Sequence, residues 1–315
     1  GKPSVCLATA AGDIWVSGMP DSPRTADAPS RLSFLLPQPQ ADGEPAAFSL
    51  LFTSSGPSLP LILRVTPNAA AIPRYGKFEL TADIWAWYHN PYDPDDIAVE
   101  ARFQAPSGRS TSVPGFLFQE YNRSLDAGRE NLRAVGDRTW KIRFCPEEVG
   151  TYRYAVRVRS RQGISREEGG SFDCLPSEEG GFVRVSSSNP AYFALSTGQS
   201  YFPMGHNVCW VTREGGTYEY ESYFEKLNAA GENYTRIWLC SWGIQLEGPR
   251  PDLYRLDDAW RLDFILELAR SKNIYVMLCL DNFHDWITYD KRGFIPYYQE
   301  NGGPVGSPKE FFTDP

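Results

Sequence analysis

Signatures of several common protein classes are missing from this 315-residue sequence. No stretch approaches the roughly 18 consecutive apolar residues that a membrane-spanning helix requires. The 31 Lys and Arg are outnumbered by 39 Asp and Glu, and the resulting net charge of −8 argues against nucleic-acid or anionic-membrane binding. There is no P-loop, GxGxxG, HExxH or GxSxG motif. We therefore expect no nucleic-acid partner, no membrane partner and no cofactor.

Cysteine is sparse, with six residues at positions 6, 145, 174, 209, 240 and 279 and no CxxC spacing. This pattern favours small buried residues with free thiols. Cys145 and Cys174 both fall in a β-rich region, so a disulfide between them stays open. A metal cluster of Cys209, Cys240 and Cys279 is the less favoured alternative, because neighbouring strands of a buried sheet often carry Cys side by side. We expect no metal site.

Aromatic residues are abundant: 9 Trp, 17 Tyr and 18 Phe make up 14% of the chain. Sheet cores need many of them, but Trp beyond that need often lines sugar-binding sites, because the apolar face of a pyranose stacks on an aromatic ring. The chain is too long for one ordinary domain, which indicates two domains, with or without part of a third.

Residues 1–70 are predicted to form a short β-rich module, to which we assign no function. Its β-like runs are separated by turns rich in Pro, Ser and Gly. The runs cover residues 13–16, 31–36, 47–53 and 61–65. Residues 67–73 are interpreted as a linker.

Residues 72–178 alternate apolar and polar side chains with a period of two. The pattern is clearest in residues 77–84, 99–103, 140–144 and 152–158. Half-buried antiparallel strands at this spacing predict an all-β, immunoglobulin-like sandwich. The Arg side chains on its outer face favour a solvated or docked surface over contacts with acidic glycans.

Residues 180–315 contain three apolar runs, at 201–208, 234–240 and 274–280, each followed by polar and aromatic residues. Amphipathic helices are predicted between them, at 217–230 and at 258–272 with Asp257 as the N-cap. Strand–helix alternation is typical of parallel α/β sheets, whose chemistry collects where the strands end. We interpret this part as the N-terminal half of a (β/α)8 TIM barrel. Residues 313–315 indicate the start of a third helix.

Polar and aromatic residues at the three strand ends are the predicted substrate-binding site. They are His206, Asn207, Trp210, Arg236, Trp242, Asp281, Asn282, His284 and Trp286. Aromatic platforms combined with amide, imidazole and guanidinium groups suit a polyhydroxylated substrate. Each residue could instead be an ordinary strand-end residue satisfied by its neighbours.

Two resemblances give these features a context. Residues 87–92 (Trp-Tyr-His-Asn-Pro-Tyr), 113–116 and 140–146 resemble the immunoglobulin-like domain that precedes the catalytic barrel in many bacterial polysaccharide-degrading enzymes. Residues 234–239 and 278–284 are similar to strands two and three of the cellulase-like barrel glycosidases, a retaining clan with two catalytic glutamates.

The resemblance implies a retaining glycoside hydrolase that acts on a polysaccharide or oligosaccharide. Arg236 would orient the nucleophilic carboxylate, His284 would lie beside the reactive sugar, and Trp242 and Trp286 would be stacking platforms. The catalytic glutamates of that clan follow strands four and seven, so they are expected beyond Pro315. Such a mechanism needs two carboxylates about 5–5.5 Å apart. The nearest ones here are Asp281, Asp285 and Glu247, which we expect to be substrate-binding or structural rather than catalytic.

Two alternatives remain. A non-catalytic carbohydrate-binding or scaffold protein with a degenerate barrel would carry the same aromatic residues. A doubly wound sheet that binds a nucleotide is less favoured, because no Gly-rich turn follows the first strand. No signal-peptide pattern opens the printed sequence, and we expect a secreted or periplasmic rather than a cytoplasmic location. The sequence specifies neither the sugar nor the oligomeric state.

Overall fold

The structure is a computed structural model that describes residues 59–248, 250–287 and 295–313, with the backbone alone at residues 283 and 287. Before residue 59 it describes the backbone of four strands, β1 (Ser4–Thr9), β2 (Gly12–Ser17), β3 (Arg31–Leu35) and β4 (Ala47–Leu51). They form two antiparallel pairs, β1 with β2 and β3 with β4. The expected runs at 13–16, 31–36 and 47–53 thus coincide with β2, β3 and β4, and the fourth, at 61–65, lies within the next strand, β5 (Leu61–Pro67).

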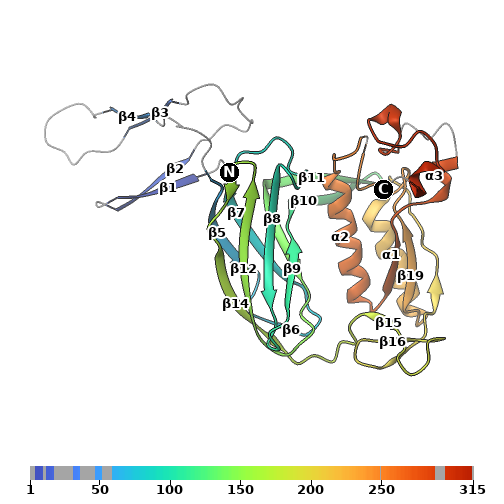
Figure 1. The fold of residues 1–315 in the computed structure, drawn as a ribbon. Helices are drawn as coiled ribbons and strands as arrows, with labels where there is room; N and C mark the ends of the chain where they lie inside the picture. Colours follow the sequence, from blue (N-terminus) through green and yellow to red (C-terminus); the bar gives the residue numbers. More distant parts are fainter. Residues whose placement is uncertain are drawn as a thin grey trace.

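Two β-sheets follow, packed on one shared apolar core (Figure 1). One has the strand order β10–β11–β7–β5, and the other has the order β6–β14–β12–β8–β9 with β13 paired to β12. The strands are β5 (Leu61–Pro67), β6 (Ala71–Pro73), β7 (Phe78–Trp85), β8 (Ile97–Gln104), β9 (Ser110–Pro114), β10 (Phe116–Asp126), β11 (Arg129–Phe144), β12 (Gly150–Ser160), β13 (Gly163–Ile164) and β14 (Glu168–Leu175).

The core of this sandwich consists of the alternate residues that the period of two predicted. Leu80 of one sheet and Val156 of the other have no exposed surface. Phe78 stacks on Phe172, with ring centroids 3.7 Å apart. Each fully buried apolar side chain stabilises the fold by about 1.5–3 kcal/mol, so the alternation holds each strand in its register. The Arg residues of β12 lie on the exposed face, where Arg157 pairs with Glu100 at 3.0 Å.

The sandwich begins earlier than the sequence analysis placed it. Residues 61–65 were assigned to the N-terminal module, and residues 67–73 to a linker. In the structure β5 pairs antiparallel with β7, and β6 pairs parallel with β14. Ile62 and Val65 pack against the sandwich core, which explains the pairing. Local composition did not reveal it, because the Pro residues in these segments resemble turn signals.

The second half of the chain begins with a small antiparallel sheet, β15 (Val183–Val185), β16 (Phe193–Leu195) and β17 (Ser200–Tyr201). A parallel sheet follows, with β18 (Gly205–His206), β19 (Tyr234–Trp238) and β20 (Tyr275–Cys279) in that order. The predicted run at 201–208 is therefore not one strand. Pro203 lies between its two halves and has no N–H to donate to a ladder.

Helices connect the parallel strands and cover one face of their sheet. They are α1 (Gly216–Ala229) and α2 (Leu256–Ser271). The short α3 (Phe283–Ile287) follows β20, and the 3-10 turns η2 (Gln299–Asn301) and η3 (Glu310–Phe312) come after it. The described strands form an open three-stranded parallel sheet. In the part of the chain that the structure describes, no helix is both long and apolar enough to cross a membrane.

Helix α1 is amphipathic, as predicted: Tyr220, Phe224 and Leu227 are buried, whereas Tyr223 is 43% exposed, and Ala230 lies beyond the end of the helix. Its hydrophobic cluster also contains Ile237 of β19 and residues of α2. This packing fixes the helix over the sheet.

Helix α2 starts earlier than expected, and its N-cap is Arg255. Asp257 is thus inside the first turn, where its carboxylate pairs with Arg261 at 3.1 Å, and the prediction of an Asp257 cap was wrong. The helix is contacted on two sides. Ile265 faces the parallel sheet, whereas Trp260 donates its indole N–H to Glu120 of β10 at 2.7 Å.

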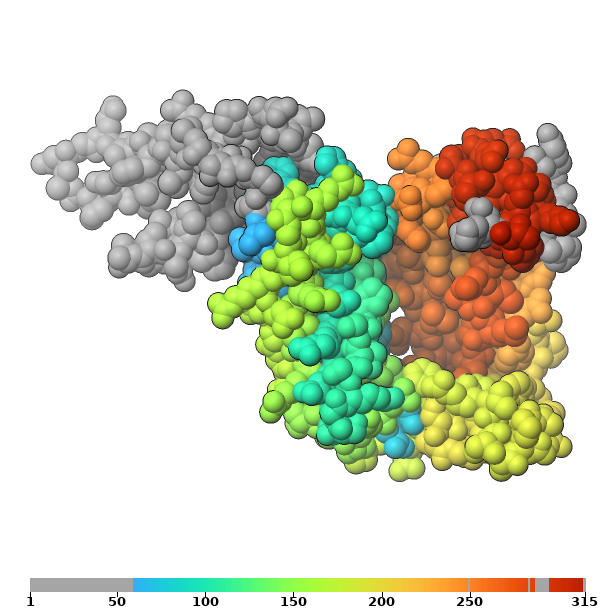
Figure 2. Space-filling model, in the orientation of Figure 1, coloured from blue at the N-terminus to red at the C-terminus, as the bar shows by residue number. Residues whose placement is uncertain are grey.

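The sandwich and the α/β part lie side by side, with the segment of β15–β17 at the foot of the α/β part (Figure 2). The long strands β10 and β11 extend to α1 and α2 (Figure 1). Ion pairs cross the boundary, including Arg143 to Asp263 at 2.7 Å and Arg270 to Glu179 at 2.8 Å. The two parts are therefore joined by charged contacts as well as by aromatic ones.

Candidate functional site

A row of aromatic rings runs across the ends of the parallel strands. Trp210 lies 5.4 Å from Trp238 and 5.6 Å from Trp242, and Trp242 lies 5.6 Å from the ring of His284. The guanidinium of Arg236 covers the ring of Trp238 at 5.1 Å. The structure thus brings together four of the nine predicted site residues, which are Trp210, Arg236, Trp242 and His284.

Trp238 joins this row and was missed by the sequence analysis. Side chains of a strand alternate between faces, and Thr235 and Ile237 are fully buried under the helices. Arg236 and Trp238 therefore share the opposite face. Their position two residues apart was the signal that could have found Trp238.

Two donors on this face have no hydrogen-bond partner among the described residues. They are Nε of Arg236 and Nε1 of Trp238, both shielded from solvent. A buried polar group without a partner costs about 1–3 kcal/mol of stability. A hydrogen bond to either donor would offset this cost.

A cavity of about 740 Å³ adjoins the aromatic row. It is lined by Trp210, Val211, Thr212, Arg213, Glu214, Glu219, Tyr223, Ser241, Trp242, Gln245 and Arg255. Ligand pockets typically measure about 300–1,000 Å³, so the volume is adequate for a small ligand. The lining contains two Arg and two Glu, and this balance of charge suits an uncharged polar ligand.

The turn after β20 contains a buried polar network that ties it to the turn after β19. Asp285 is 2% exposed and accepts hydrogen bonds from the Ser241 hydroxyl at 2.7 Å and from Nδ2 of Asn282 at 2.7 Å. Asn282 also bonds the Leu239 carbonyl at 3.3 Å. The amide of Asn282 is thus occupied by the protein, so Asn282 serves to hold the loop.

Asp281 lies at the edge of that network. Burial raises its pKa, although hydrogen bonds from the Trp286 indole and the Asn282 N–H act in the opposite direction. Glu247, the other carboxylate considered, accepts a hydrogen bond from the Tyr297 hydroxyl at 2.5 Å. Asp281, Asp285 and Glu247 are therefore all engaged by neighbouring groups.

Trp286 is 6% exposed and does not form an open platform. Its ring lies 4.2 Å from Phe311 and parallel to Tyr297 at 6.2 Å, inside a separate apolar cluster. Because Trp286 is buried, the prediction that it is a stacking platform for sugar was wrong. The partners come from residues 295–311, so nothing near Trp286 in the sequence indicates the packing.

His206 and Asn207 are placed away from the aromatic row. The register pairs His206 with Thr235, close to the start of β19, whereas Trp238 ends that strand. Nδ1 of His206 bonds Glu232, which precedes β19, at 2.8 Å. Asn207 is exposed. The sequence analysis put both at the strand ends, and His206 does end β18. Because β18 ends opposite the start of β19, however, this strand end does not reach the aromatic row.

The described cysteines are free thiols, including Cys145 and Cys174. Burial raises the pKa of Cys145 to about 11 and that of Cys240 to about 12. These two thiols are therefore protonated at neutral pH, which makes them poor nucleophiles. Within residues 59–248, 250–287 and 295–313, no group of three or more potential metal ligands occurs. Cys6, and the expected helix start at 313–315 beyond Thr313, lie outside the residues described with side chains.

Comparisons with known proteins connect the chain to carbohydrate enzymes. Residues 71–159 match a family described as a domain of unknown function, DUF5060. The chain is 29% identical over 138 residues to mannan endo-1,4-beta-mannosidase 4 of Oryza sativa subsp. japonica, which covers 42% of this chain and 29% of that protein.

Among solved structures, a candidate glycoside hydrolase from Bacteroides vulgatus superposes with a TM-score of 0.52 and 19% identity. The match covers 72% of this chain and 43% of that one, so the chain spans less than half the length of either relative. Residues 71–159 thus form a DUF5060 domain, and the chain is similar to glycoside hydrolases.

Proposed function

We propose that this chain provides the substrate-binding part of a glycoside hydrolase that acts on a polysaccharide or oligosaccharide. The observation that carries the proposal is the row of Trp210, Trp238 and Trp242 beside a cavity of about 740 Å³. Aromatic rings stack on the apolar faces of sugars, while nearby polar groups bind hydroxyls. The similarity to a mannan endo-1,4-beta-mannosidase supports the same substrate class.

We further propose that the parallel strands β18, β19 and β20 with α1 and α2 are the opening of a (β/α)8 barrel, and that the sandwich is an immunoglobulin-like module. Parallel strands joined by helices, with aromatic and polar residues at their carboxyl ends, support the first assignment. Two sheets that share one core support the second. A secreted or periplasmic location fits an enzyme acting on polysaccharides.

In this proposal the catalytic mechanism is of the retaining type. The two catalytic glutamates that it needs are not among the 315 printed residues. None of Asp281, Asp285 and Glu247 lines the cavity, which supports leaving all three without a catalytic role. Arg236 would then orient the nucleophile, and His284 beside Trp242 would contact the reactive sugar. By itself the chain would bind sugar without cleaving it. Binding without cleavage is also what a non-catalytic carbohydrate-binding protein would do.

Titration of the 315-residue chain with β-1,4-mannohexaose and cellohexaose, followed by Trp fluorescence and calorimetry, tests the proposal. We expect one of these β-linked oligosaccharides to change the fluorescence and to release heat. Absence of binding at about 1 mM sugar, which corresponds to a binding free energy weaker than about −4 kcal/mol, would overturn it. A longer protein that extends past residue 315 should release reducing ends from the bound polysaccharide. If it binds without release, the non-catalytic alternative is the correct one.

A further inference from the structure

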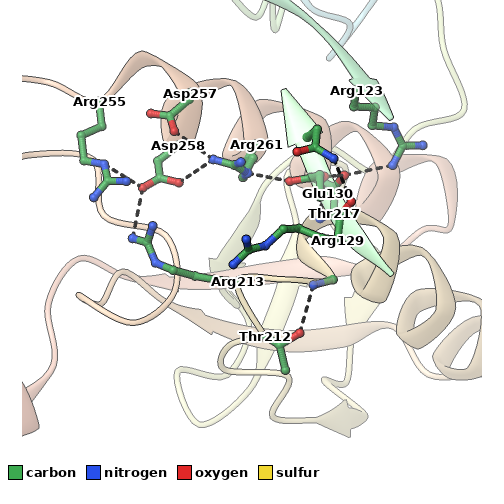
Figure 3. A network of polar contacts seen from close by, with 12 residues as sticks. Arg123, Arg129, Glu130, Thr212, Arg213, Thr217, Arg255, Asp257, Asp258 and Arg261 are labelled. Atoms are coloured by element: carbon green, nitrogen blue, oxygen red, sulfur yellow. Dashed lines mark hydrogen bonds and ion pairs between the residues drawn. The ribbon is translucent and has the colours of Figure 1, made fainter. Parts of the chain in front are cut away.

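Glu130 lies at the tip of the β10–β11 hairpin of the sandwich, and its side chain is completely buried. Its carboxylate accepts hydrogen bonds from the backbone N–H of Thr217 at 3.0 Å, from the Thr217 hydroxyl, and from Nε of Arg261 at 2.6 Å. A buried charge is tolerated when it is paired and hydrogen-bonded, and it is costly otherwise. Glu130 is therefore firmly held at this position between α1 and α2 (Figure 3).

The same hairpin tip holds the loop that lines the cavity. The backbone N–H of Glu130 donates to the Glu214 carbonyl at 2.6 Å. Gly216 has φ +51°, and a Cβ there would come within 2.4 Å of the Glu130 carboxylate. The loop 208–215, which carries Trp210, is thus followed by a glycine at the start of α1. Glycine is required there because of the positive φ angle and because a side chain would collide with the Glu130 carboxylate.

A second branch of contacts leads from Glu130 through α2 to the cavity wall. Arg261, bound to Glu130, also donates to Asp258 at 3.0 Å. The other oxygen of Asp258 accepts from Nε of Arg255 at 3.2 Å and lies 3.7 Å from Arg213. Arg213 and Arg255 both line the cavity, as does Gln245, whose N–H donates to Asp258 at 3.3 Å. Figure 3 shows this continuous chain of partners.

Two ion pairs between the sandwich and the α/β part do not lead to the cavity. Asp263 pairs with Arg143 at 2.7 Å, and Glu267 pairs with Lys77. Neither acidic residue lines the cavity or bonds a residue that does. The interface therefore contains contacts that continue to the cavity, through Glu130, and ion pairs that only join the two parts, at Asp263 and Glu267.

We propose that the β10–β11 hairpin supports the sugar-binding site. In this proposal Glu130 is a positioning residue that holds the 208–215 loop, and the side chains of Arg213 and Arg255, in their binding geometry. Glu130 itself does not touch the sugar. This inference rests on the proposed function. It assigns a role to the DUF5060 domain, within which the hairpin lies.

The test compares Glu130→Gln with the matched control Asp263→Asn in the 315-residue chain, using β-1,4-mannohexaose or cellohexaose, whichever binds the wild type. Coupling through a contact network changes affinity by about two- to thirtyfold, and we expect a loss in this range for Glu130→Gln. Asp263→Asn should lower the melting temperature without changing the affinity. Equal affinity losses in the two variants, or no loss in Glu130→Gln at a temperature where it is folded, would overturn the proposal.

Hydrogen–deuterium exchange at residues 208–219 provides a readout that needs no sugar. Glu130→Gln should accelerate exchange there, and Asp263→Asn should not. If neither sugar binds the wild type, the proposed function fails, while this measurement still decides whether Glu130 holds the loop. If Glu130→Gln does not fold, Thr217→Val, which removes a donor to Glu130 and preserves the charge, should produce a smaller loss of affinity and faster exchange. Wild-type exchange and affinity in Thr217→Val would then contradict the proposal.

Discussion

Trp210 and Trp242 stand perpendicular to one another, at 89°, with ring centroids 5.6 Å apart. Trp210 follows β18 and Trp242 follows β19, so the contact joins the loops after two neighbouring parallel strands. Trp210 remains 46% exposed in spite of this contact. An aromatic ring that is held by a neighbour and open on its other side is well suited to stack on a sugar.

Replacing Trp210 by Ala should weaken oligosaccharide binding much more than it weakens the fold. We expect a loss of about 1.4–2 kcal/mol in binding free energy, or about tenfold to thirtyfold in affinity, as for an aromatic anchor of an interface. Calorimetric titration of the folded variant measures it. Trp87→Ala is the matched control, because Trp87 is 47% exposed but lies in the sandwich. Equal affinities of Trp210→Ala and the wild type would remove this ring from the site.

Trp286 should behave in the opposite way. It is 6% exposed and packs on Tyr297, Tyr298 and Phe311. Trp286→Ala should therefore lower the free energy of unfolding by about 3–5 kcal/mol, as large-to-small changes in a core do. Urea denaturation measures this loss. The milder Trp286→Phe should retain the wild-type affinity for oligosaccharide, and a large affinity loss in that variant would restore Trp286 to the binding site.

The sequence predicted the central strands of the sandwich well, because β7, β8, β11 and β12 each encode their own buried face. Leu80 and Ala82 of β7 alternate with polar residues and are buried in the structure. The parallel order of β18, β19 and β20 was also predicted from strand–helix alternation. β5 was assigned to the wrong part, because its partner β7 is specified by tertiary packing and no local signal indicates the pairing.

The candidate site was harder to predict, since proximity to a strand end does not determine where a side chain points. Asn282 and Trp286 both follow β20 closely, yet both are buried among partners distant in the sequence. His206 does end β18, as predicted, but β18 ends opposite Thr235 near the start of β19, so His206 lies away from the aromatic row. Trp238, in contrast, was recoverable from alternation within β19.

The network of Asp285 should be needed for both the fold and the site. Asp285→Ala would leave the buried donors of Ser241 and Asn282 without an acceptor, at about 1–3 kcal/mol for each unsatisfied group. Chemical denaturation should show this loss. Sugar affinity should fall as well, because Ser241 precedes Trp242. Ser241→Ala removes a single hydroxyl and should cost about 1 kcal/mol. A variant Asp285→Ala as stable as Ser241→Ala would contradict this interpretation.

Asp96 should make the stability of the sandwich depend on pH. Its burial opposes ionisation, but the N–H groups of Asn90 (2.7 Å) and His89 and the guanidinium of Arg161 outweigh burial and lower its pKa below the ordinary 3.8. Because the folded pKa is lowered, the ionised carboxylate stabilises the fold above about pH 3.8, and this contribution is lost as the pH falls through the folded pKa.

Asp96→Asn should therefore lower the free energy of unfolding by about 2 kcal/mol at neutral pH, as expected for hydrogen bonds to a charged group. The difference from the wild type should shrink below about pH 4, where the Asp96 carboxylate of the wild type becomes protonated in the unfolded and then in the folded state. Urea denaturation at a series of pH values measures both effects. Asp126→Asn, at an exposed position near the hairpin tip, is the control and should change stability little at any pH. If the loss of unfolding free energy in Asp96→Asn stayed constant down to pH 3, the size and shape of the Asp96 side chain, rather than its charge, would hold the 89–96 turn.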